Sequence, residues 1–364
     1  MTKLCIVTIV DSISVTSMPV NEFVLYRSRM NYPYRQVLVS CSGDVPEDVD
    51  IPSDVQLFLV GGNTNKMRPA LRQVINECKE RNEEIIIHLH AQKSAIKFFL
   101  ASVGLKLRKK TLFTIHSSYS SRNLKYKLSS CLCSLLSKYS NCVSHVAYAE
   151  YSPMVKRIKG ERMFAIQNGV DYERVQDATR RLPNHNEAFD MFKVVCIGRM
   201  IPIKNQQFLI RLMKHLPETE LILIGKEDVH MSALARELGV DGRVKMKGLL
   251  PRDEVFRILN ECGIYVSASL VEGMPVSVLE AMSVGLIPVL SDIPPHQEVS
   301  NGCSLFNTLP LIEKDWLQTI RTYQQLSRQE LIGLSTQIKD SIVRNFSLES
   351  MHKKYDEIYE LLSH

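Results

Sequence analysis

Short apolar runs alternate with longer amphipathic stretches along the first half of the chain, a pattern that predicts parallel β-strands separated by α-helices. The expected strands are rich in β-branched and aliphatic residues and span Lys3–Val10, Gln36–Ser40, Val55–Val60, Glu84–His88, Thr111–His116 and Cys142–Ala147. Helical spacing predicts helices at Lys66–Arg81, Gln92–Gly104 and Asn123–Tyr139. Buried strands between helices indicate a sheet covered on both faces.

The pattern then restarts in the second half. Strands are expected at Phe192–Ile197, Glu220–Ile224, Arg243–Lys247, Gly263–Val266 and Leu286–Leu290, and helices at Asn205–His215, Val229–Leu238, Arg252–Asn260 and Pro275–Val284. Residues 180–187 are polar, contain a proline and suit a linker. The predicted fold class is α/β, with two doubly wound, Rossmann-like domains facing a central cleft, because such sheets bind ligands beyond the carboxyl ends of their strands.

Composition agrees with two globular domains. The chain has 364 residues, 45% hydrophobic and 23% charged, and no apolar run long enough to span a bilayer. The first ten residues are better explained as a buried strand than as a signal peptide, since no small-residue cleavage site follows. Nine cysteines without metal-ligand spacing predict reduced thiols in the cytoplasm, with neither a metal site nor a disulfide framework.

Charge is distributed unevenly. Residues 1–170 contain 23 lysines and arginines against 13 acidic residues, and no acidic residue but ten basic ones lie between Glu84 and Glu150. The block 93–138 therefore predicts peripheral contact with an anionic membrane, on the inner face of the plasma membrane, although solvated helix faces explain it equally well. Nucleic acid is disfavoured, because stacking aromatic residues are few and no binding module is present.

The segment from Glu272 to Glu280 is the strongest candidate for chemistry. It follows a strand, turns through Gly273 and Pro275, and opens a helix whose first N–H groups, at Met274, Val276 and Ser277, could bind an anion. Pro275 is expected at the first helical position. The two carboxylates suit sugar and ribose hydroxyls, which donate strong hydrogen bonds to carboxylates. Without further context, the alternative of two exposed glutamates is the simpler one.

Two other positions carry candidate groups. Arg199 and Lys204 lie five residues apart on a turn between a strand and a helix, where they could clamp a diphosphate or be merely solvated cations. His116 ends a strand, at the sheet edge where ligands bind, although a histidine in such a place is more often structural.

The stretch Glu272–Val289 resembles the E-x7-E signature of glycosyltransferase family 4, which are retaining enzymes with the GT-B fold. The resemblance implies that Arg199 and Lys204 stabilise a nucleotide diphosphate leaving group, that Glu272 and His116 contact the donor sugar, and that Glu280 binds ribose. It also implies that Gly273–Val276 bind donor phosphate, that Gly248 and Leu249 belong to the nucleobase loop, and that no metal or other cofactor is needed.

The resemblance also implies a domain layout. Residues 1–170 would bind the acceptor and 171–345 the nucleotide sugar, while 346–364 would form a helix that crosses back onto the first domain. The Gln167–Asp171 segment is similar to the family's interdomain junction. Two departures stand out: residues 10–22 have no glycine where the family has a glycine pair, and the segment Ile224–Asp228 replaces another such pair.

The predicted function is transfer of a hexosyl unit, with retention, from a UDP- or GDP-sugar to a hydroxyl. The expected acceptor is a lipid-linked or polysaccharide glycan in bacterial cell-surface glycan biosynthesis. Two alternatives remain open at this stage: a nucleotide-sugar epimerase of the same layout, and a non-catalytic protein that binds sugar nucleotides or a lipid surface. Turnover of a donor with and without acceptor discriminates among the three.

Overall fold

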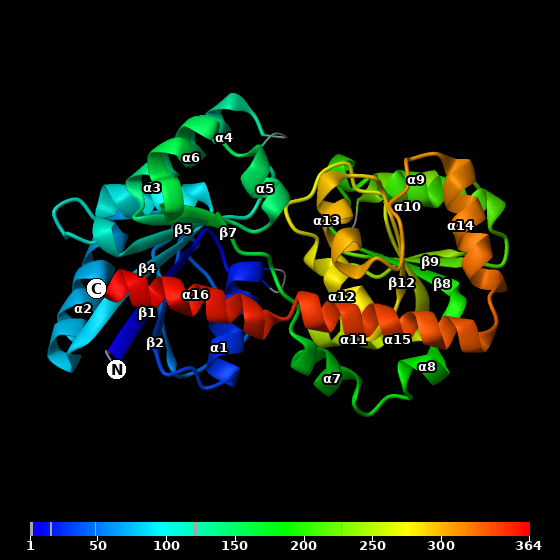
Figure 1. The fold of residues 1–364 in the computed structure, drawn as a ribbon, viewed down its shortest axis with the longest axis horizontal. Helices are drawn as coiled ribbons and strands as arrows, with labels where there is room; N and C mark the ends of the chain where they lie inside the picture. The colour runs from blue at the N-terminus through cyan, green and yellow to red at the C-terminus, as the bar shows by residue number, and fades with distance from the viewer. Residues whose placement is uncertain (1–2, 15–16, 48, 120–121, 227) are drawn as a thin grey trace. The chain divides into compact units, whose positions relative to one another are not determined.

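A computed structural model describes residues 3–14, 17–47, 49–119, 122–226 and 228–364. The chain divides into two compact units (Figure 1). The first comprises Met1–Gln167 together with Met351–His364, and the second comprises Asn168–Ser350. The C-terminal segment is therefore part of the unit that the N-terminus begins.

The first unit is built on a seven-stranded sheet in the order β3-β2-β1-β4-β5-β6-β7, with every neighbouring pair parallel. The strands are β1 (Lys3–Val10), β2 (Arg35–Ser40), β3 (Val55–Leu59), β4 (Glu83–His90), β5 (Thr111–Ile115), β6 (Tyr139–Cys142) and β7 (Met163–Ala165). The longer helices are α2 (Thr64–Arg81), α3 (Gln92–Ala101), α4 (Leu124–Leu136) and α16 (Leu348–Ser363). Shorter helices are α1 (Tyr26–Arg29), which continues a π-helical turn at Pro19–Leu25, α5 (His145–Glu150) and α6 (Pro153–Lys159), with single 3-10 turns at Arg108–Lys110 and Gly160–Arg162.

Strand alternation gives the two faces of this sheet different chemistry. One face is apolar: Val7, Leu89 and Phe113 are fully buried in one core with residues of α2, α3 and α4. The opposite face carries polar side chains on β4, β5 and β6, among them His88 and Asn141, and both are completely buried.

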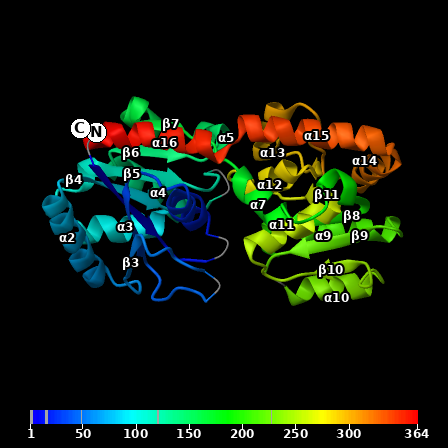
Figure 2. The same cartoon turned by 90° about the horizontal axis from the view of Figure 1, so that it is seen from below.

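The helix α16 covers that polar face, opposite α3 (Figure 2). His88 Nδ1 lies 2.7 Å from Tyr359 Oη, and Asn141 Nδ2 donates to Tyr355 Oη at 2.8 Å. Arg27, from α1, is also buried; its Nε donates to His352 Nδ1 at 3.0 Å. Buried polar groups need partners, and here a segment about 200 residues or more distant in sequence supplies them. The expected return of the C-terminal helix to the first domain is confirmed.

The second unit has a five-stranded parallel sheet in the order β10-β9-β8-β11-β12. The strands are β8 (Asp190–Ile197), β9 (Glu220–Ile224), β10 (Val244–Met246), β11 (Cys262–Ser267) and β12 (Ile287–Leu290). The helices are α7 (Tyr172–Thr179), α8 (His185–Ala188), α9 (Gln206–Leu212), α10 (Val229–Glu237), α11 (Arg252–Glu261), α12 (Val276–Val284), α13 (Pro294–Cys303), α14 (Glu313–Gln325) and α15 (Arg328–Asn345), with 3-10 turns at Pro202–Lys204 and Met213–His215. The chain is therefore α/β with two parallel, Rossmann-like sheets.

A glycine in the junction segment Gln167–Asp171 is required by close packing of the backbone. A Cβ atom on Gly169 would lie 2.5 Å from the Ser347 carbonyl oxygen. The neighbouring Val170 bonds through both backbone groups to this segment: its N–H donates to Phe346 and its carbonyl accepts from Leu348. The segments that enter and leave the second unit are thus bonded to each other.

One predicted element is wrong, and a predicted helix is correct except for its end. The expected strand Cys142–Ala147 ends at Cys142, and α5 follows because the Ser144 side chain caps it by accepting from the Ala147 N–H at 3.0 Å. The expected helix Asn123–Tyr139 stops at Leu136, where an extended Ser137 breaks the helix.

The expected linker at residues 180–187 is also wrong, because it lies inside the second unit. His185 is buried, and its Nδ1 lies 2.9 Å from the Asn260 carbonyl oxygen. The segment is polar in composition, which predicted a linker, but the buried His185 side chain attaches it to α11.

Candidate functional site

Glu272 lies in the loop between β11 and α12 and is held by two donors. Its Oε1 accepts from Lys204 Nζ and, at 2.7 Å, from Ser269 Oγ. The carboxylate is only 12% exposed and the lysine 21%. The structure thus brings together two residues that the sequence placed in separate motifs, and it adds Ser269, which sequence reasoning missed.

The loop that carries Arg199 and Lys204 is fixed by backbone contacts. Gln206 Nε2 donates to the carbonyl oxygens of Gly198, at 3.4 Å, and Arg199, at 3.0 Å. The Leu270 N–H donates to the Ile203 carbonyl at 2.8 Å, which joins this loop to the Glu272 loop. The Arg199 side chain is exposed. One cation is therefore engaged by a carboxylate, while the other extends from the surface of the same loop.

Glu280 lies on α12 and is 7% exposed, so it is not an ordinary surface residue. Arg252, at the start of α11, donates from Nε to Glu280 Oε1 at 2.6 Å. Arg252 was not among the candidates, because a contact between residues 28 positions apart on separate helices leaves no local sequence pattern. Each candidate carboxylate therefore has a cationic partner, which removes the repulsion expected of two buried negative charges.

The start of α12 differs from the prediction by one residue. The helix begins at Val276, and Pro275 is its N-cap, not its first helical residue. The Val276 N–H donates to the Met274 carbonyl at 3.0 Å, so this group is already engaged and is not offered to an anion. Met274 is buried and Gly273 lies in the turn before it.

A buried histidine that the sequence did not indicate is linked to the Glu272 loop by hydrogen bonds. His296 is completely buried on α13, with Nδ1 2.9 Å from the Ser291 carbonyl oxygen. Ser291 Oγ in turn donates to the Ser269 carbonyl at 2.6 Å. Burial lowers the pKa of His296 below its usual value, which keeps the ring neutral.

The position of Gly225, at the end of β9, requires a glycine because another part of the backbone lies against it. Its φ is +149°, and a Cβ atom there would lie 2.1 Å from the Gly198 carbonyl oxygen. The Gly225 N–H donates to the Gly248 carbonyl at 2.8 Å, and Leu249 beyond it is exposed. The loops that follow β8, β9 and β10, at Gly198, Gly225 and Gly248, thus meet at one end of the five-stranded sheet. Glu227, which belongs to the departing segment, lies outside the described residues.

His116 belongs to the first unit, where it directly follows β5. Its Nε2 lies 2.9 Å from His90 Nδ1, and the two rings are stacked with centroids 5.1 Å apart. Burial lowers the pKa of His116 to about 4, so its ring is neutral at physiological pH. His88 lies on the same face of the sheet as His90, two residues along β4. It bonds to Tyr359 and Thr114, so its role is structural.

The loop without glycine, residues 10–22, includes Val15 and Thr16, which lie outside the described residues. Its later part runs into the π-helical turn at Pro19–Leu25, where Val20 and Phe23 are completely buried. This end of the loop therefore contributes to the core.

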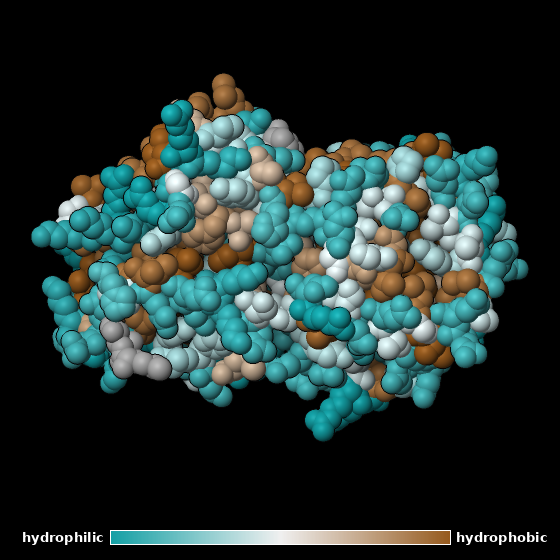
Figure 3. Space-filling view, viewed as in Figure 1, coloured by the Kyte–Doolittle hydropathy of each residue, from teal (hydrophilic) through white to brown (hydrophobic). Residues whose placement is uncertain are grey.

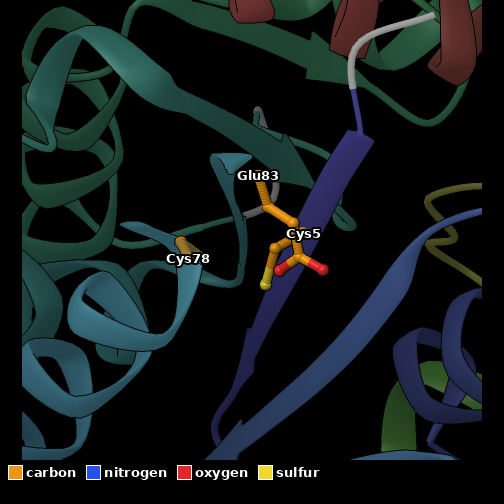
Figure 4. A group of neighbouring side chains, drawn as sticks. All are labelled: Cys5, Cys78 and Glu83. Carbon is orange, nitrogen blue, oxygen red and sulfur yellow. The ribbon is translucent and has the colours of Figure 1, made fainter. Parts of the chain in front are cut away.

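One group of potential metal ligands is found within the part of the chain that the structure describes. Cys5, Cys78 and Glu83 offer ligand atoms within 4.8 Å of one another, from two neighbouring strands and α2 (Figure 4). However, Arg35 donates to Glu83 Oε2 at 2.8 Å and to Cys78 Sγ at 3.2 Å. The guanidinium group of Arg35 therefore already supplies the positive charge in this cluster. Ion pairing and packing account for the arrangement of Cys5, Cys78 and Glu83.

Comparison with known proteins bears on the second unit. Residues 179–301 match the family model described as Glycosyl transferases group 1. The match covers about a third of the chain and includes Arg199, Lys204, Arg252, Glu272 and Glu280.

Two curated relatives are similar over part of the chain. The chain is 28% identical over 144 residues to GDP-mannose:cellobiosyl-diphosphopolyprenol alpha-mannosyltransferase of Xanthomonas campestris, a match that covers 38% of this chain and 37% of that protein. It is 25% identical over 214 residues to UDP-Gal:alpha-D-GlcNAc-diphosphoundecaprenol alpha-1,3-galactosyltransferase of Escherichia coli, covering 54% of each. The chain thus covers less than two thirds of the length of either relative.

The fold extends over the whole chain. Anabaena Alr3699/HepE, solved in complex with UDP and glucose, superposes with a TM-score of 0.74 at 17% identity, covering 98% of this chain and 99% of that one. The chain has the GT-B glycosyltransferase fold that the sequence predicts. Among the described residues, no helix combines the length and apolar character needed to cross a membrane.

Proposed function

We propose that this protein is a retaining glycosyltransferase of family 4, which moves a hexosyl unit from a nucleotide diphosphate sugar to a hydroxyl group. The observation that carries the proposal is the pairing of Glu272 with Lys204. A partly buried carboxylate and a cation, each suited to a different part of a sugar nucleotide, lie in contact at the end of the sheet where ligands bind.

The pairing suggests how a donor binds. A diphosphate attracts Lys204 and the exposed Arg199, and releases Glu272 from its ion pair. Glu272 then accepts hydrogen bonds from sugar hydroxyls while Ser269 holds its geometry. In the same way Glu280 accepts from ribose hydroxyls, with Arg252 fixing its carboxylate. Gly248 and Leu249 contribute backbone groups to the nucleobase, and the turn Gly273–Pro275 lines the phosphates.

Chemistry then follows from charge stabilisation. The bond between the anomeric carbon and the diphosphate oxygen breaks, and the departing oxygen keeps the electron pair. The acceptor oxygen bonds to the same face of that carbon, and its proton passes to the departing diphosphate oxygen. Arg199 and Lys204 stabilise the growing negative charge, which is commonly the largest catalytic contribution. These two cations perform the task that a metal ion performs elsewhere, so the proposed reaction needs no metal or other cofactor.

The first unit, in this proposal, binds the acceptor, and His116 contacts the donor sugar through its neutral ring. A lipid-linked or polysaccharide glycan in bacterial surface-glycan assembly is the proposed acceptor, since both relatives are named for diphosphate-linked polyprenol substrates. UDP or GDP is the proposed carrier, because their names and the HepE complex include these nucleotides. All nine cysteines are free thiols, which favours the cytoplasm as the place of action.

Glu272→Ala tests the proposal. With a panel of nucleotide sugars and polyprenyl-diphosphate glycan acceptors, the wild-type chain is expected to release nucleotide diphosphate only when acceptor is present. Loss of Glu272 should lower that rate by about a hundredfold or more, because the donor sugar would no longer be held in position to react. The exposed Glu313→Ala serves as the matched control and should keep the wild-type rate.

Four outcomes contradict the proposal. Isomerised donor without acceptor would indicate an epimerase, binding without turnover would indicate a non-catalytic protein, and an unchanged rate in Glu272→Ala would remove the assigned role. A product of inverted anomeric configuration, read from the proton coupling of the new linkage, would contradict retention.

A further inference from the structure

Four polar side chains of the second unit are buried in or beside the loop that carries Glu272. Figure 3 shows many hydrophilic side chains on the surface of that unit, where a hydroxyl or an imidazole group is solvated by water. These four groups are instead between 0% and 6% exposed, so each depends on hydrogen bonds within the protein. They are Ser267, at the end of β11, Ser269, Ser291, which follows β12, and His296, on α13. We call them the serine–histidine network.

The direction of each hydrogen bond next to Glu272 is fixed by a group that can only accept. The Glu272 carboxylate accepts from Ser269 Oγ at 2.7 Å. Because that hydroxyl gives its only proton to the carboxylate, the contact of 3.1 Å between Ser267 Oγ and Ser269 Oγ is donated by Ser267. Two hydroxyl dipoles in series therefore point at the carboxylate, and hydrogen bonds in such a chain strengthen one another.

The second branch of the network holds the backbone of Ser269. Ser291 Oγ donates to the Ser269 carbonyl at 2.6 Å. His296 Nδ1 lies 2.9 Å from the Ser291 carbonyl oxygen and 3.1 Å from its hydroxyl oxygen. Since a carbonyl oxygen can only accept, the single proton of the neutral imidazole is on Nδ1. His296 Nε2 is buried without a hydrogen-bond partner among the described residues, so the ring acts on this loop through Nδ1 alone.

Removal of Lys204 from Glu272 by a bound diphosphate would leave the network as the support of this carboxylate. The Glu272 side chain is only 12% exposed, and an unpaired charge in such a place is unfavourable. Ser269 remains as a donor, and a hydrogen bond to a charged group is stronger than one between neutral groups. Its orientation is fixed from two sides, because Ser267 donates to its hydroxyl and Ser291 to its carbonyl.

We infer that the serine–histidine network positions Glu272 for the hydroxyl groups of the donor sugar, and that it adds affinity for the sugar and not for the nucleotide diphosphate. The inference rests on the proposed function, because that proposal assigns the sugar to Glu272. Ser269 contacts the carboxylate directly. The other three groups act through Ser269 and are positioning residues. A carboxylate held in one orientation before the sugar arrives loses less freedom on binding it, which favours the complex.

Calorimetric titration of the full chain tests the inference without turnover. The ligands are UDP-glucose, UDP-galactose and GDP-mannose, each compared with free UDP or GDP, and the measured quantity is the ratio of the Kd for the nucleotide sugar to the Kd for the free diphosphate. Ser269→Ala should raise this ratio about tenfold, the effect of one lost hydrogen bond to a charged group. Ser291→Ala should raise it by a smaller factor. Affinity for the free diphosphate should change little, because water solvates Glu272 when no sugar is bound.

Three further variants control for the loss of a hydroxyl group and for the role of the ring. Ser300→Ala is the matched control, because this hydroxyl also lies on α13 and donates to a backbone carbonyl, that of Phe306, at 2.7 Å. It should leave the ratio unchanged. His296→Asn places an N–H group where Nδ1 stands and should keep the ratio, whereas His296→Leu removes the donor and should raise it. The two serine variants keep the volume of the core and carry the test if His296→Leu does not fold.

The background Glu272→Ala separates positioning from general damage to the loop. There Ser269→Ala should raise the ratio no further, because the carboxylate that it positions is gone. An equal loss of affinity for nucleotide sugar and free diphosphate, an unchanged ratio in either serine variant, or a full further increase in the Glu272→Ala background would overturn the inference.

Acceptor-dependent transfer by the wild type is measured separately, so failure of the inference is distinguishable from failure of the proposed function. Transfer together with an unchanged ratio in the serine variants would remove the inference and keep the proposed function. A raised ratio without any transfer would do the reverse. A wild-type chain that binds no nucleotide sugar of the panel would overturn both.

Discussion

Arg252 and Glu280 show how a single residue pair can serve both stability and the candidate site. The side chains are 16% and 10% exposed, so neither charge is well solvated. Removing one partner of such a pair leaves an uncompensated charge, whereas replacing both with apolar groups is often tolerated. The pair therefore allows stability to be separated from its proposed role in binding ribose.

Arg252→Ala is expected to lower the free energy of unfolding of the second unit by about 3 kcal/mol, because Glu280 becomes a buried, unpaired carboxylate. Urea unfolding followed by the fluorescence of Trp316 measures this directly, since the chain's one tryptophan lies in that unit. The double variant Arg252→Met with Glu280→Leu should recover most of the loss. A double variant that unfolds as easily as Arg252→Ala would contradict an ion-pair origin of the effect.

Residue partnerships of this kind mark the limit of what the sequence alone predicts. Glu272, Lys204 and Glu280 could be selected because they belong to local motifs whose turn and helix start are readable. Arg252 and His296 could not, because their roles depend on how α11 and α13 pack against the motif-bearing loops. Physical contact between distant segments is not encoded in the spacing of either one.

At the scale of elements, strands were easier to predict than their boundaries with helices. The strand Glu220–Ile224 was predicted to the residue, since five apolar-rich positions lie between polar turns. The stretch from Tyr139 to Ala147 was not, because a capping serine in the middle of an apolar run converts its second half into a helix. Local hydrophobicity reports burial there but not the choice between strand and helix.

The docking of α16 depends on neutral histidines, which makes the first unit sensitive to acid. Burial lowers the pKa values of His88, His90 and His352 well below the usual value in the folded state. The unfolded chain therefore binds protons below about pH 6.5 that the folded chain does not, and stability falls as the pH falls. Burial raises the pKa of Asp356, and this carboxyl group therefore acts in the opposite direction.

Between pH 7 and pH 5.5 each of these histidines is expected to remove up to about 1.4 kcal/mol of stability per pH unit. Hydrogen exchange of the β4 and β5 amides should accelerate accordingly as the solution is acidified, after correction for the intrinsic effect of pH on exchange. His88→Gln should be less stable at pH 7 and should show a shallower dependence on pH. Protection that stays constant or rises on acidification would show that these rings are not held neutral.

At the scale of the whole molecule, the first unit is completed by the last residues of the chain. Met351–His364 belong to it, although the whole second unit intervenes in sequence. Without α16, the polar face of the sheet would lose the partners of Arg27, His88 and Asn141. The second unit has its own sheet and its own core and does not share these contacts.

A chain that ends at Ser350 is therefore expected to lose structure in one unit only. The side chains of Arg27, His88 and Asn141 would then have lost these partners. If each stayed buried, its missing hydrogen bond would cost about 1–3 kcal/mol, and the sum is comparable to the stability of a domain. Hydrogen exchange should show loss of protection in β1, β4 and β5, while the unfolding midpoint read from Trp316 stays near that of the full chain. A chain that ends at Leu362 is the matched control, because it keeps Tyr355, Tyr359 and the buried Leu362. Loss of both units in the shorter chain would show that they fold as one cooperative body, and retention of both would show that the polar face is stable without its helix.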